Sequence, residues 1–131
     1  MTQTNVLEPK LIELTPVQYF SAKLAYEMTP WALKSILEKT PAQVLVLDVR
    51  NAEMFAIEHI KGAKNIPLVD LVSKLATLPK DKTIVTYCGD LTCGLAPKAA
   101  LELAQKGFKV MELVGGIDIW SKKGFPVEKK A

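Results

Sequence analysis

The pattern of apolar and polar residues along the chain predicts strands and helices that alternate. Short apolar runs at residues 44–47, 83–87 and 110–114 predict strands that are covered on both faces. A briefer strand is expected at residues 63–66. Apolar residues at helical spacing predict helices at 30–40, 52–60, 68–78, 95–106 and 117–123. This alternation is typical of an α/β fold with a mainly parallel sheet.

The amino-terminal part of the chain precedes this pattern. Residues 1–27 are expected to form a leader, and residues 28–131 the α/β domain. Thr15-Pro16 places a hydroxyl cap before a proline at the first helical position, which predicts a short amphipathic helix at residues 17–26. Residues 11–14 are a candidate for docking on the domain. The pattern leaves open whether the leader covers its own domain or contacts another subunit.

Two tryptophans are expected to pack in the interior. The pair Thr29-Pro30 begins the helix that ends near residue 40, and Trp31 belongs to its apolar stripe with Leu33. Trp120 is assigned to the core as well, with a place at the mouth of a pocket as the alternative.

The most informative stretch is the strand at 83–87 together with the loop that follows it. The loop begins with Cys88, contains Cys93, and is followed by the helix at 95–106. A strand, loop and helix in this order put the loop at the carboxyl edge of the sheet, where the first N–H groups of the helix lack internal partners. Those groups favour an anion, so we expect a lowered pKa for Cys88 and a usable thiolate nucleophile. The alternative is a small cysteine buried in the core.

Composition removes several classes of function. The chain has 131 residues, of which 49% are hydrophobic, so it is expected to form one domain with a substantial core. Its net charge is +3 and Arg50 is its only arginine, which argues against nucleic-acid binding. No apolar run approaches the ~20 residues of a membrane span, and we see no secretory signal. Two cysteines in one loop are not a disulfide framework, so a cytoplasmic location is expected.

Several short motifs occur in order between about residues 28 and 126. They are Leu47-Asp48-Val49-Arg50, the stretch from His59 to Pro67, Tyr87-Cys88, Gly107-Phe108, and Gly115-Gly116-Ile117 with Trp120, Gly124 and Pro126. In this order and spacing they resemble the rhodanese superfamily of sulfurtransferases, whose catalytic cysteine ends a central strand and starts a loop of six residues. The resemblance implies a three-layer α/β/α fold with a mainly parallel sheet of about five strands.

The resemblance also implies a reaction. The Cys88 thiolate takes the outer sulfur of thiosulfate or a persulfide, holds it as a persulfide, and passes it to a thiol or cyanide acceptor. No cofactor and no metal is implied. The expected partners are small sulfur donors and acceptors, with a protein persulfide as a further candidate donor, and the chain is expected to be a monomer or weak dimer. The loop amides expected to bind the sulfur belong to Gly89, Asp90, Leu91, Thr92, Cys93 and Gly94.

The loop differs from that of many family members. It lacks their arginine and carries Asp90, whose negative charge lies beside a site meant for an anion. We therefore expect the thiosulfate dianion to be a poor donor and a monoanionic or protein-borne persulfide to be better. Gly94 stands where related phosphatases need an arginine, which argues against phosphatase activity.

Cys93 leaves two interpretations open. It is a small residue in the first turn of the helix, or it is a thiol that resolves an oxidised or persulfidated Cys88 by forming a disulfide. The rival functions are therefore a thiol redox sensor that uses Cys88 and Cys93, and a non-catalytic or regulatory module that binds a protein partner.

Three other polar residues are candidates for the site. Asp48 and Arg50 end a strand next to the central one, and we expect them to anchor the turn through charge-assisted hydrogen bonds. His59 is the only histidine, and the resemblance places it in a structural segment away from Cys88.

Overall fold

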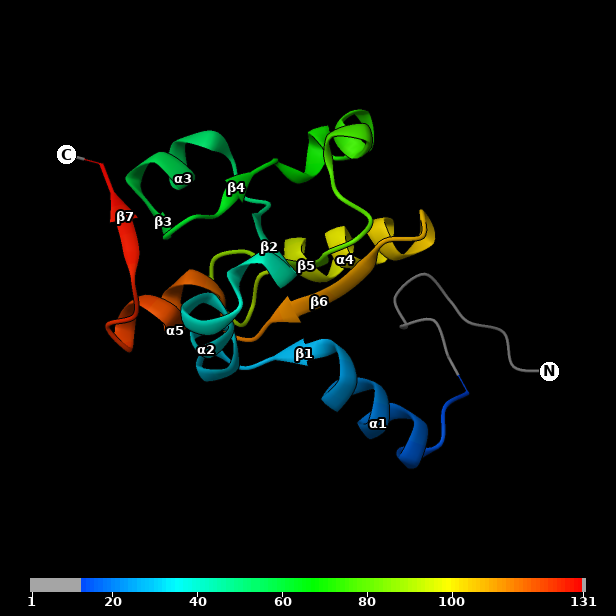
Figure 1. The fold of residues 1–131 in the computed structure, drawn as a ribbon. Helices are drawn as coiled ribbons and strands as arrows, with labels where there is room; N and C mark the ends of the chain where they lie inside the picture. Colours follow the sequence, from blue (N-terminus) through cyan, green and yellow to red (C-terminus); the bar gives the residue numbers. More distant parts are fainter. Residues whose placement is uncertain (1–12, 131) are drawn as a thin grey trace.

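A parallel sheet of five strands, in the order β1-β6-β5-β2-β4, forms the centre of the computed structural model (Figure 1). The structure describes residues 13–130. The strands are β1 (Glu27–Met28), β2 (Val44–Asp48), β3 (Glu58–Ile60), β4 (Lys64–Asn65), β5 (Thr83–Tyr87), β6 (Lys109–Leu113) and β7 (Val127–Lys129). The α-helices are α1 (Pro16–Tyr26), α2 (Pro30–Lys39), α3 (Ala52–Ile57), α4 (Leu95–Gln105) and α5 (Gly116–Lys122). Short 3₁₀ helices are η1 (Pro41–Gln43), η2 (Leu68–Asp70) and η3 (Val72–Thr77).

Alternation along the two central strands explains the three layers. On β2, Leu47 packs on one face with α4, η2 and η3, and Val46 packs on the other face with α2 and α5. β5 repeats the pattern with Ile84 on the first face and Val85 on the second. Successive side chains of a strand point to opposite faces, so both central strands carry apolar residues on both faces. The predicted α/β/α fold with about five mainly parallel strands is confirmed.

The segment at 52–60 differs from the predicted helix. α3 ends at Ile57, and Glu58–Ile60 form β3, which pairs antiparallel with β7. Neither strand was predicted, because each has only three residues and depends on a partner distant in the sequence.

The segment at 68–78 also departs from the prediction, since it forms η2 and η3 rather than one α-helix. Ser73 Oγ donates to the carbonyl oxygen of Asp70 at 2.8 Å, and Thr77 Oγ1 donates to that of Lys74 at 2.6 Å. These local bonds offer the backbone an alternative to regular helical pairing. Apolar spacing marks the buried side of this segment but does not distinguish a 3₁₀ helix from an α-helix.

The two tryptophans behave differently. Trp31 is 60% exposed, so its predicted place in the buried stripe of α2 is wrong, and Lys123 Nζ lies 4.0 Å from the centre of its ring. Leu33 is the residue of α2 that is fully buried. Trp120 is fully buried as predicted and donates from Nε1 to the carbonyl oxygen of Pro126 at 2.8 Å.

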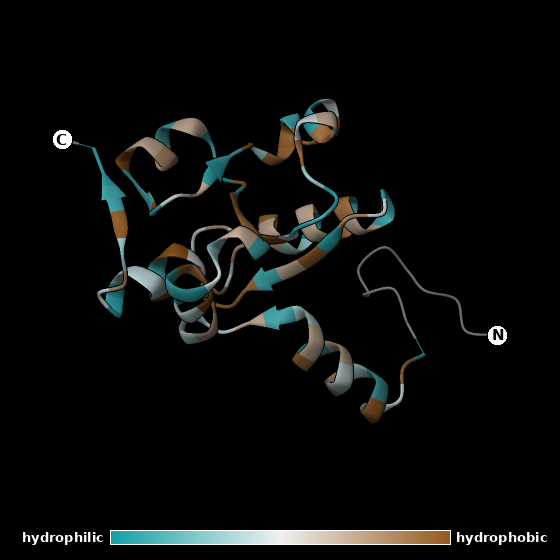
Figure 2. Ribbon diagram, in the orientation of Figure 1, coloured by the Kyte–Doolittle hydropathy of each residue, from teal (hydrophilic) through white to brown (hydrophobic). Residues whose placement is uncertain are grey.

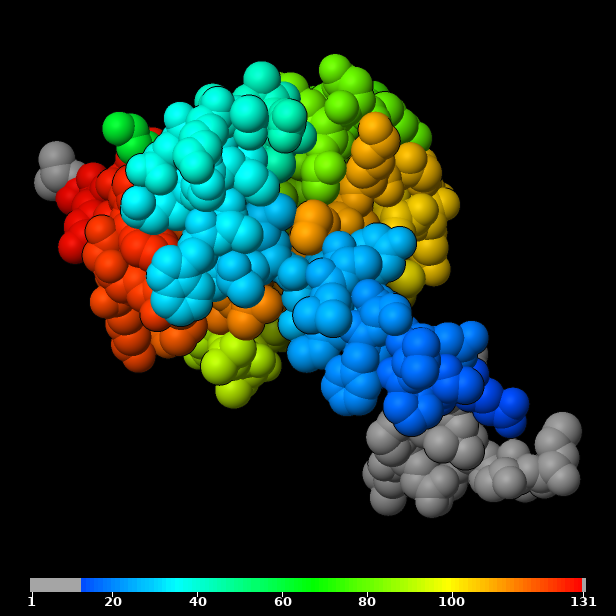
Figure 3. All heavy atoms as spheres, turned by 60° about the horizontal axis from the view of Figure 1, so that its bottom comes forward, coloured from blue at the N-terminus to red at the C-terminus, as the bar shows by residue number. Residues whose placement is uncertain are grey.

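The predicted leader helix is present as α1. Its start is a capping box, in which the Thr15 hydroxyl accepts from the Gln18 amide and the Gln18 side chain accepts from the Thr15 amide. No residue of α1 is buried, and the helix extends from the body of the domain (Figure 3). Apolar residues occur along its turns (Figure 2). β1 follows directly and joins the sheet edge beside β6. The suggested docking concerned residues 11–14, of which 11 and 12 lie outside the described residues and Leu14 is half-exposed.

Among residues 13–130, no helix is both long and apolar enough to cross a membrane.

Candidate active site

Cys88 is the first residue after β5, at the carboxyl edge of the sheet. Cys88 is 3% exposed, and it lines a cavity of about 240 Å³ together with Cys93 and Ala96. The lining residues come from the loop, from the start of α4, from the end of β6 and the turn after it, and from α1 and β1. The strand, loop and helix order expected from the sequence therefore does create a hollow beside Cys88.

The loop is shaped by its own polar groups. Asp90 Oδ1 accepts from the Thr92 amide at 2.9 Å and from the Thr92 hydroxyl at 2.6 Å. The Cys93 amide donates to the Asp90 carbonyl oxygen at 3.2 Å. The amides of Thr92 and Cys93, which were expected to bind sulfur, thus have partners inside the loop. Leu91 is exposed at its tip, and Gly94 is the N-cap residue of α4.

The turn between β6 and α5 holds the loop from behind. The Ile117 amide donates to the Cys88 carbonyl oxygen at 3.0 Å, and the Asp118 amide donates to that of Gly89 at 2.9 Å. Gly116 has a φ of +58°, and a Cβ there would overlap the carbonyl oxygen of Cys88. Gly116 is a supporting residue that the sequence analysis used only as part of a motif. The available signal in the sequence was the Gly115-Gly116 pair, because glycine allows another part of the backbone to approach closely.

The environment of the Cys88 sulfur favours the neutral thiol. Burial and, to a smaller extent, a hydrogen bond with the Cys93 side chain raise the pKa of Cys88 to about 12. The amides of Ala96 and Gly89 act in the opposite direction. The predicted lowering of this pKa is therefore wrong for the resting protein, because the loss of water around the sulfur outweighs the amides of the helix start.

Cys93 has the opposite tendency. Burial opposes its ionisation, but the hydrogen bond from Cys88 and the amides of Gly89 and Leu95 outweigh burial and hold the pKa of Cys93 below its ordinary value. Cys88 Sγ also lies 3.6 Å from the Cys93 carbonyl oxygen. Both thiols are free. When one of the two thiols loses its proton, Cys93, the more exposed of the two, is therefore the residue that carries the negative charge.

Charged side chains at the cavity are mainly acidic. Lys23, Glu27, Asp90 and Glu112 line it, and the lysine is paired with Glu27 at 2.9 Å. Hydrogen bonds from Thr92 lower the pKa of Asp90, which keeps that carboxylate ionised. Burial, with a smaller effect of Glu27, raises the pKa of Glu112. A doubly charged anion therefore finds no unpaired cation among the lining residues.

Asp48 and Arg50 form a buried ion pair at the end of β2. Arg50 Nη2 lies 2.7 Å from Asp48 Oδ2 and 2.6 Å from the Glu58 carbonyl oxygen. Asn65 Nδ2 donates to the carbonyl oxygens of both residues of the pair. Neither residue of the pair lines the Cys88 cavity. Their geometry is that of an anchor between β2, β3 and β4, as the sequence suggested.

His59 lies in β3 and does not line the Cys88 cavity. Its Nδ1 is 2.8 Å from the Phe55 carbonyl oxygen, and its ring stacks on Phe55 with centroids 3.7 Å apart. These contacts give it a structural position. In the described part of the chain, no group of three or more His, Cys, Asp or Glu side chains is arranged to hold a metal ion.

Comparison with known proteins agrees with this geometry. The family model described as "Rhodanese-like domain" matches residues 29–123. A crystal structure of a Bacillus halodurans protein has a TM-score of 0.82 and 37% identity, and it covers 87% of this chain and 84% of its own. The Escherichia coli protein named thiosulfate sulfurtransferase PspE is 36% identical over 74 residues, which are 54% of this chain and 68% of that protein.

Longer relatives also match. An HTH-type transcriptional regulator of Mycobacterium tuberculosis is 38% identical over 89 residues, which are 68% of this chain. The chain spans only 39% of that regulator and 32% of a second relative from the same organism. The part they share with this chain is the domain that surrounds Cys88. With the family model covering most of its residues, the chain belongs to the rhodanese-like domain family.

Proposed function

We propose that this protein is a sulfurtransferase that carries sulfane sulfur as a persulfide on Cys88. The observation that supports it best is the position of Cys88, at the carboxyl edge of the sheet, beside a cavity of about 240 Å³, with the amides of Ala96 and Gly89 near its sulfur. Distant relatives that bear sulfurtransferase names support the same reaction class.

The reaction consists of two balanced displacements. The Cys88 thiolate attacks the outer sulfur of a donor persulfide, a new S–S bond forms, and the donor leaves as a thiolate. An acceptor thiolate then attacks the terminal sulfur on Cys88, takes it as its own persulfide, and releases the Cys88 thiolate. The amides of Ala96 and Gly89 stabilise the negative charge on sulfur during both steps.

The raised pKa of Cys88 limits its thiolate fraction at neutral pH, so sulfur loading should accelerate as the pH rises. Cys93 lines the same cavity, and its side chain raises the pKa of Cys88, so it holds the resting nucleophile in its neutral form. This role uses Cys93 without a disulfide.

The charges at the cavity select the donor. Asp90, Glu27 and Glu112 surround it, and Lys23 is already paired, so thiosulfate with two negative charges is disfavoured relative to a persulfide with one or none. We expect kcat/KM for cysteine persulfide, whose net charge is −1 when the persulfide is ionised, to exceed that for thiosulfate by at least about tenfold, which corresponds to ~1.4 kcal/mol. Asp90→Asn should reduce that preference, because it removes one negative charge from the rim. Equal kcat/KM for the two donors in the wild type would contradict this assignment.

A second candidate is a thiol redox sensor, which the hydrogen bond between the two free thiols favours. Here a peroxide oxidises the Cys93 thiolate to a sulfenic acid, and Cys88 displaces water to form a disulfide. The peroxide is reduced, two thiols are oxidised, and the protein loses two hydrogens.

Intact mass distinguishes these functions. Incubation with glutathione persulfide should add one sulfur atom to the wild type and none to Cys88→Ser. A loss of two hydrogens under peroxide without sulfur gain would instead favour the redox sensor. No change under either reagent would favour a regulatory module that binds a protein, in line with the regulator among the relatives. Sulfur transfer and redox sensing both need reduced thiols, so a reducing compartment such as the cytoplasm suits these two functions.

A further inference from the structure

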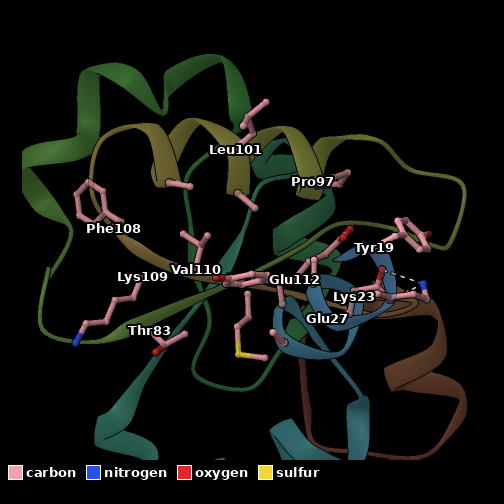
Figure 4. Close-up of a pocket in the computed structure, with 16 residues that line it drawn as sticks. Tyr19, Lys23, Glu27, Thr83, Pro97, Leu101, Phe108, Lys109, Val110 and Glu112 are labelled. Atoms are coloured by element: carbon pink, nitrogen blue, oxygen red, sulfur yellow. Dashed lines mark hydrogen bonds and ion pairs between the residues drawn. The ribbon is translucent and has the colours of Figure 1, made fainter. Parts of the chain in front are cut away.

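A second hollow lies between α1 and α4, and Cys88 is not among its lining residues. It has a volume of about 770 Å³ and is lined by both helices and by β6 (Figure 4). Val110 lies on its floor and Phe108 at its border. Both helices contribute small residues, namely Ala22 and Ala25 from α1 and Ala100 and Ala104 from α4. Small side chains on both walls let another helix approach closely. We name this feature the α1–α4 groove.

The other side of α1 carries a second apolar surface. Val17, Phe20 and Leu24 are spaced three and four residues apart, so they form one stripe along the helix. Leu24 is 84% exposed and Val17 is 76% exposed. None of the three lines the α1–α4 groove. We name these three residues the outer stripe.

A helix of this length needs tertiary contacts. α1 has 11 residues and none is buried, whereas isolated helices shorter than ~12–15 residues are marginal in water. Its contacts with its own domain are confined chiefly to β1 and β6. The helix thus has apolar surfaces on two sides and little packing on either.

We propose that the α1–α4 groove receives the outer stripe of a second copy of this chain, in a symmetric dimer. Under twofold symmetry, the stripe of each protomer enters the groove of its partner, so both grooves and both stripes are covered together. A different protein or peptide seated in the groove would leave the outer stripe in water. The self-complementary arrangement accounts for both apolar surfaces at once.

The size and charge of the surface fit this partner. With roughly 150–250 Å² for a large side chain, the exposed parts of six residues amount to on the order of 600–950 Å², a range that includes the ~800 Å² that each partner gives a standard interface. The six residues are Val17, Tyr19, Phe20, Leu24, Tyr26 and Leu101. The only charged residue of α1 is Lys23, which is paired with Glu27 at 2.9 Å. Two copies therefore meet without strong charge repulsion.

The dimer would also border the active site. Lys23, Glu27 and Glu112 line both the α1–α4 groove and the Cys88 cavity. A partner helix in the groove would cover one side of these three residues and restrict access to the cavity from that direction. The proposed dimer does not depend on sulfur transfer, so the two proposals can fail separately.

Analytical ultracentrifugation of the full 131-residue chain over a range of concentrations tests the proposal. The wild type should sediment as a dimer that dissociates on dilution. Leu24→Glu should raise the dissociation constant by at least about a hundredfold, because symmetry places the unpaired charge in the interface twice. Ala104→Glu changes the groove rather than the stripe and should have a similar effect. Both positions are exposed in the single chain, so folding should survive, which circular dichroism checks.

The matched control is Val69→Glu in η2, a position that is 91% exposed and does not line the groove. It should leave the dissociation constant unchanged. A wild type that remains a monomer at the highest concentration would overturn the proposal. A dimer that tolerates both Leu24→Glu and Ala104→Glu would overturn it too, since its interface would lie elsewhere.

Discussion

The loop at Cys88 and the helix α1 lie on neighbouring parts of the surface but are built in opposite ways. In the loop, Asp90 accepts hydrogen bonds from Thr92, and the turn at Gly116 donates hydrogen bonds to the backbone of Cys88 and Gly89. Cys88 itself is almost fully buried. In α1 the polar start is equally well formed, with the Thr15 capping box, yet no side chain is buried.

The comparison shows that local hydrogen bonds and tertiary packing are separate requirements. The loop has both, so small changes there should alter stability and chemistry together. α1 has only the first, so changes there should leave the domain intact and alter what the helix contacts. Four predictions test this difference.

The largest expected effect is at the anchor beside the active-site edge. Arg50→Ala leaves the Asp48 carboxylate buried without its partner, which typically costs about 3–5 kcal/mol of unfolding free energy. The matched change on α1 is Lys23→Ala, which also removes the cation of an ion pair but at an exposed site. It should leave the urea midpoint unchanged. Similar midpoints for the two variants in urea titrations would show that the comparison is wrong.

Gly116→Ala should have the next largest effect on stability. A Cβ at this position overlaps the Cys88 carbonyl oxygen at a positive φ, so we expect a loss of about 2–5 kcal/mol and slower sulfur loading. Gly62→Ala is the control, because Gly62 also has a positive φ but has open space around it. It should cost only about 1 kcal/mol and leave loading unchanged. Equal losses in thermal melts would mean that the turn at Gly116 does not press on the loop.

A chemical effect is expected at Cys93. Cys93→Ala removes the hydrogen bond and charge that raise the pKa of Cys88, so that pKa should fall and alkylation of Cys88 at pH 7–8 should accelerate about three- to tenfold. In the wild type, iodoacetamide should modify Cys93 first, and Cys88 should react faster as the pH rises toward its raised pKa. Peptide mapping by mass spectrometry follows both sites. Slower modification of Cys88 in the variant would contradict the coupling.

The raised pKa of Cys88 also predicts how the stability of the folded protein changes with pH. Cys88 stays neutral in the folded protein, whereas an unfolded cysteine ionises near pH ~8.5. The contribution of Cys88 to the free energy of unfolding is therefore fully present below that pH and is lost as the pH rises toward about 12.

The smallest effect should come from the cap of α1. Thr15→Ala removes the hydroxyl that accepts from the Gln18 amide, which typically costs a helix about 0.5–2 kcal/mol. Because α1 has no buried residue, the loss should appear as faster amide hydrogen exchange in α1 and not as a lower Tm of the domain. A fall in Tm at low protein concentration would mean that α1 supports the domain within a single chain.

The parts of the fold that the sequence predicted have strong local signals. β5 was predicted at residues 83–87, where it lies, because β-branched residues and the following loop define both ends. α4 ends as expected before Gly107, whose φ is +85°. The parts that were missed depend on distant partners, as β3 does on β7, or on competition among local bonds, as in η3.

The same distinction holds in the site. Motifs singled out Cys88, whose catalytic role stays a prediction, and Asp48 and Arg50, which form a buried ion pair at the end of β2. They did not reveal that burial outweighs the helix amides at Cys88, because burial is a property of the whole fold. Trp31 shows the reverse error, since an apolar side chain was assigned to a core that it does not enter.

The most direct test of the central claim is to locate the transferred sulfur. The protein is incubated with glutathione persulfide, alkylated, digested and analysed by mass spectrometry, with Cys88→Ser and Cys93→Ala treated in parallel. We predict one extra sulfur on the Cys88 peptide of the wild type and of Cys93→Ala, and none on any peptide of Cys88→Ser. Extra sulfur found only on Cys93, or on no cysteine of the wild type, would contradict the account.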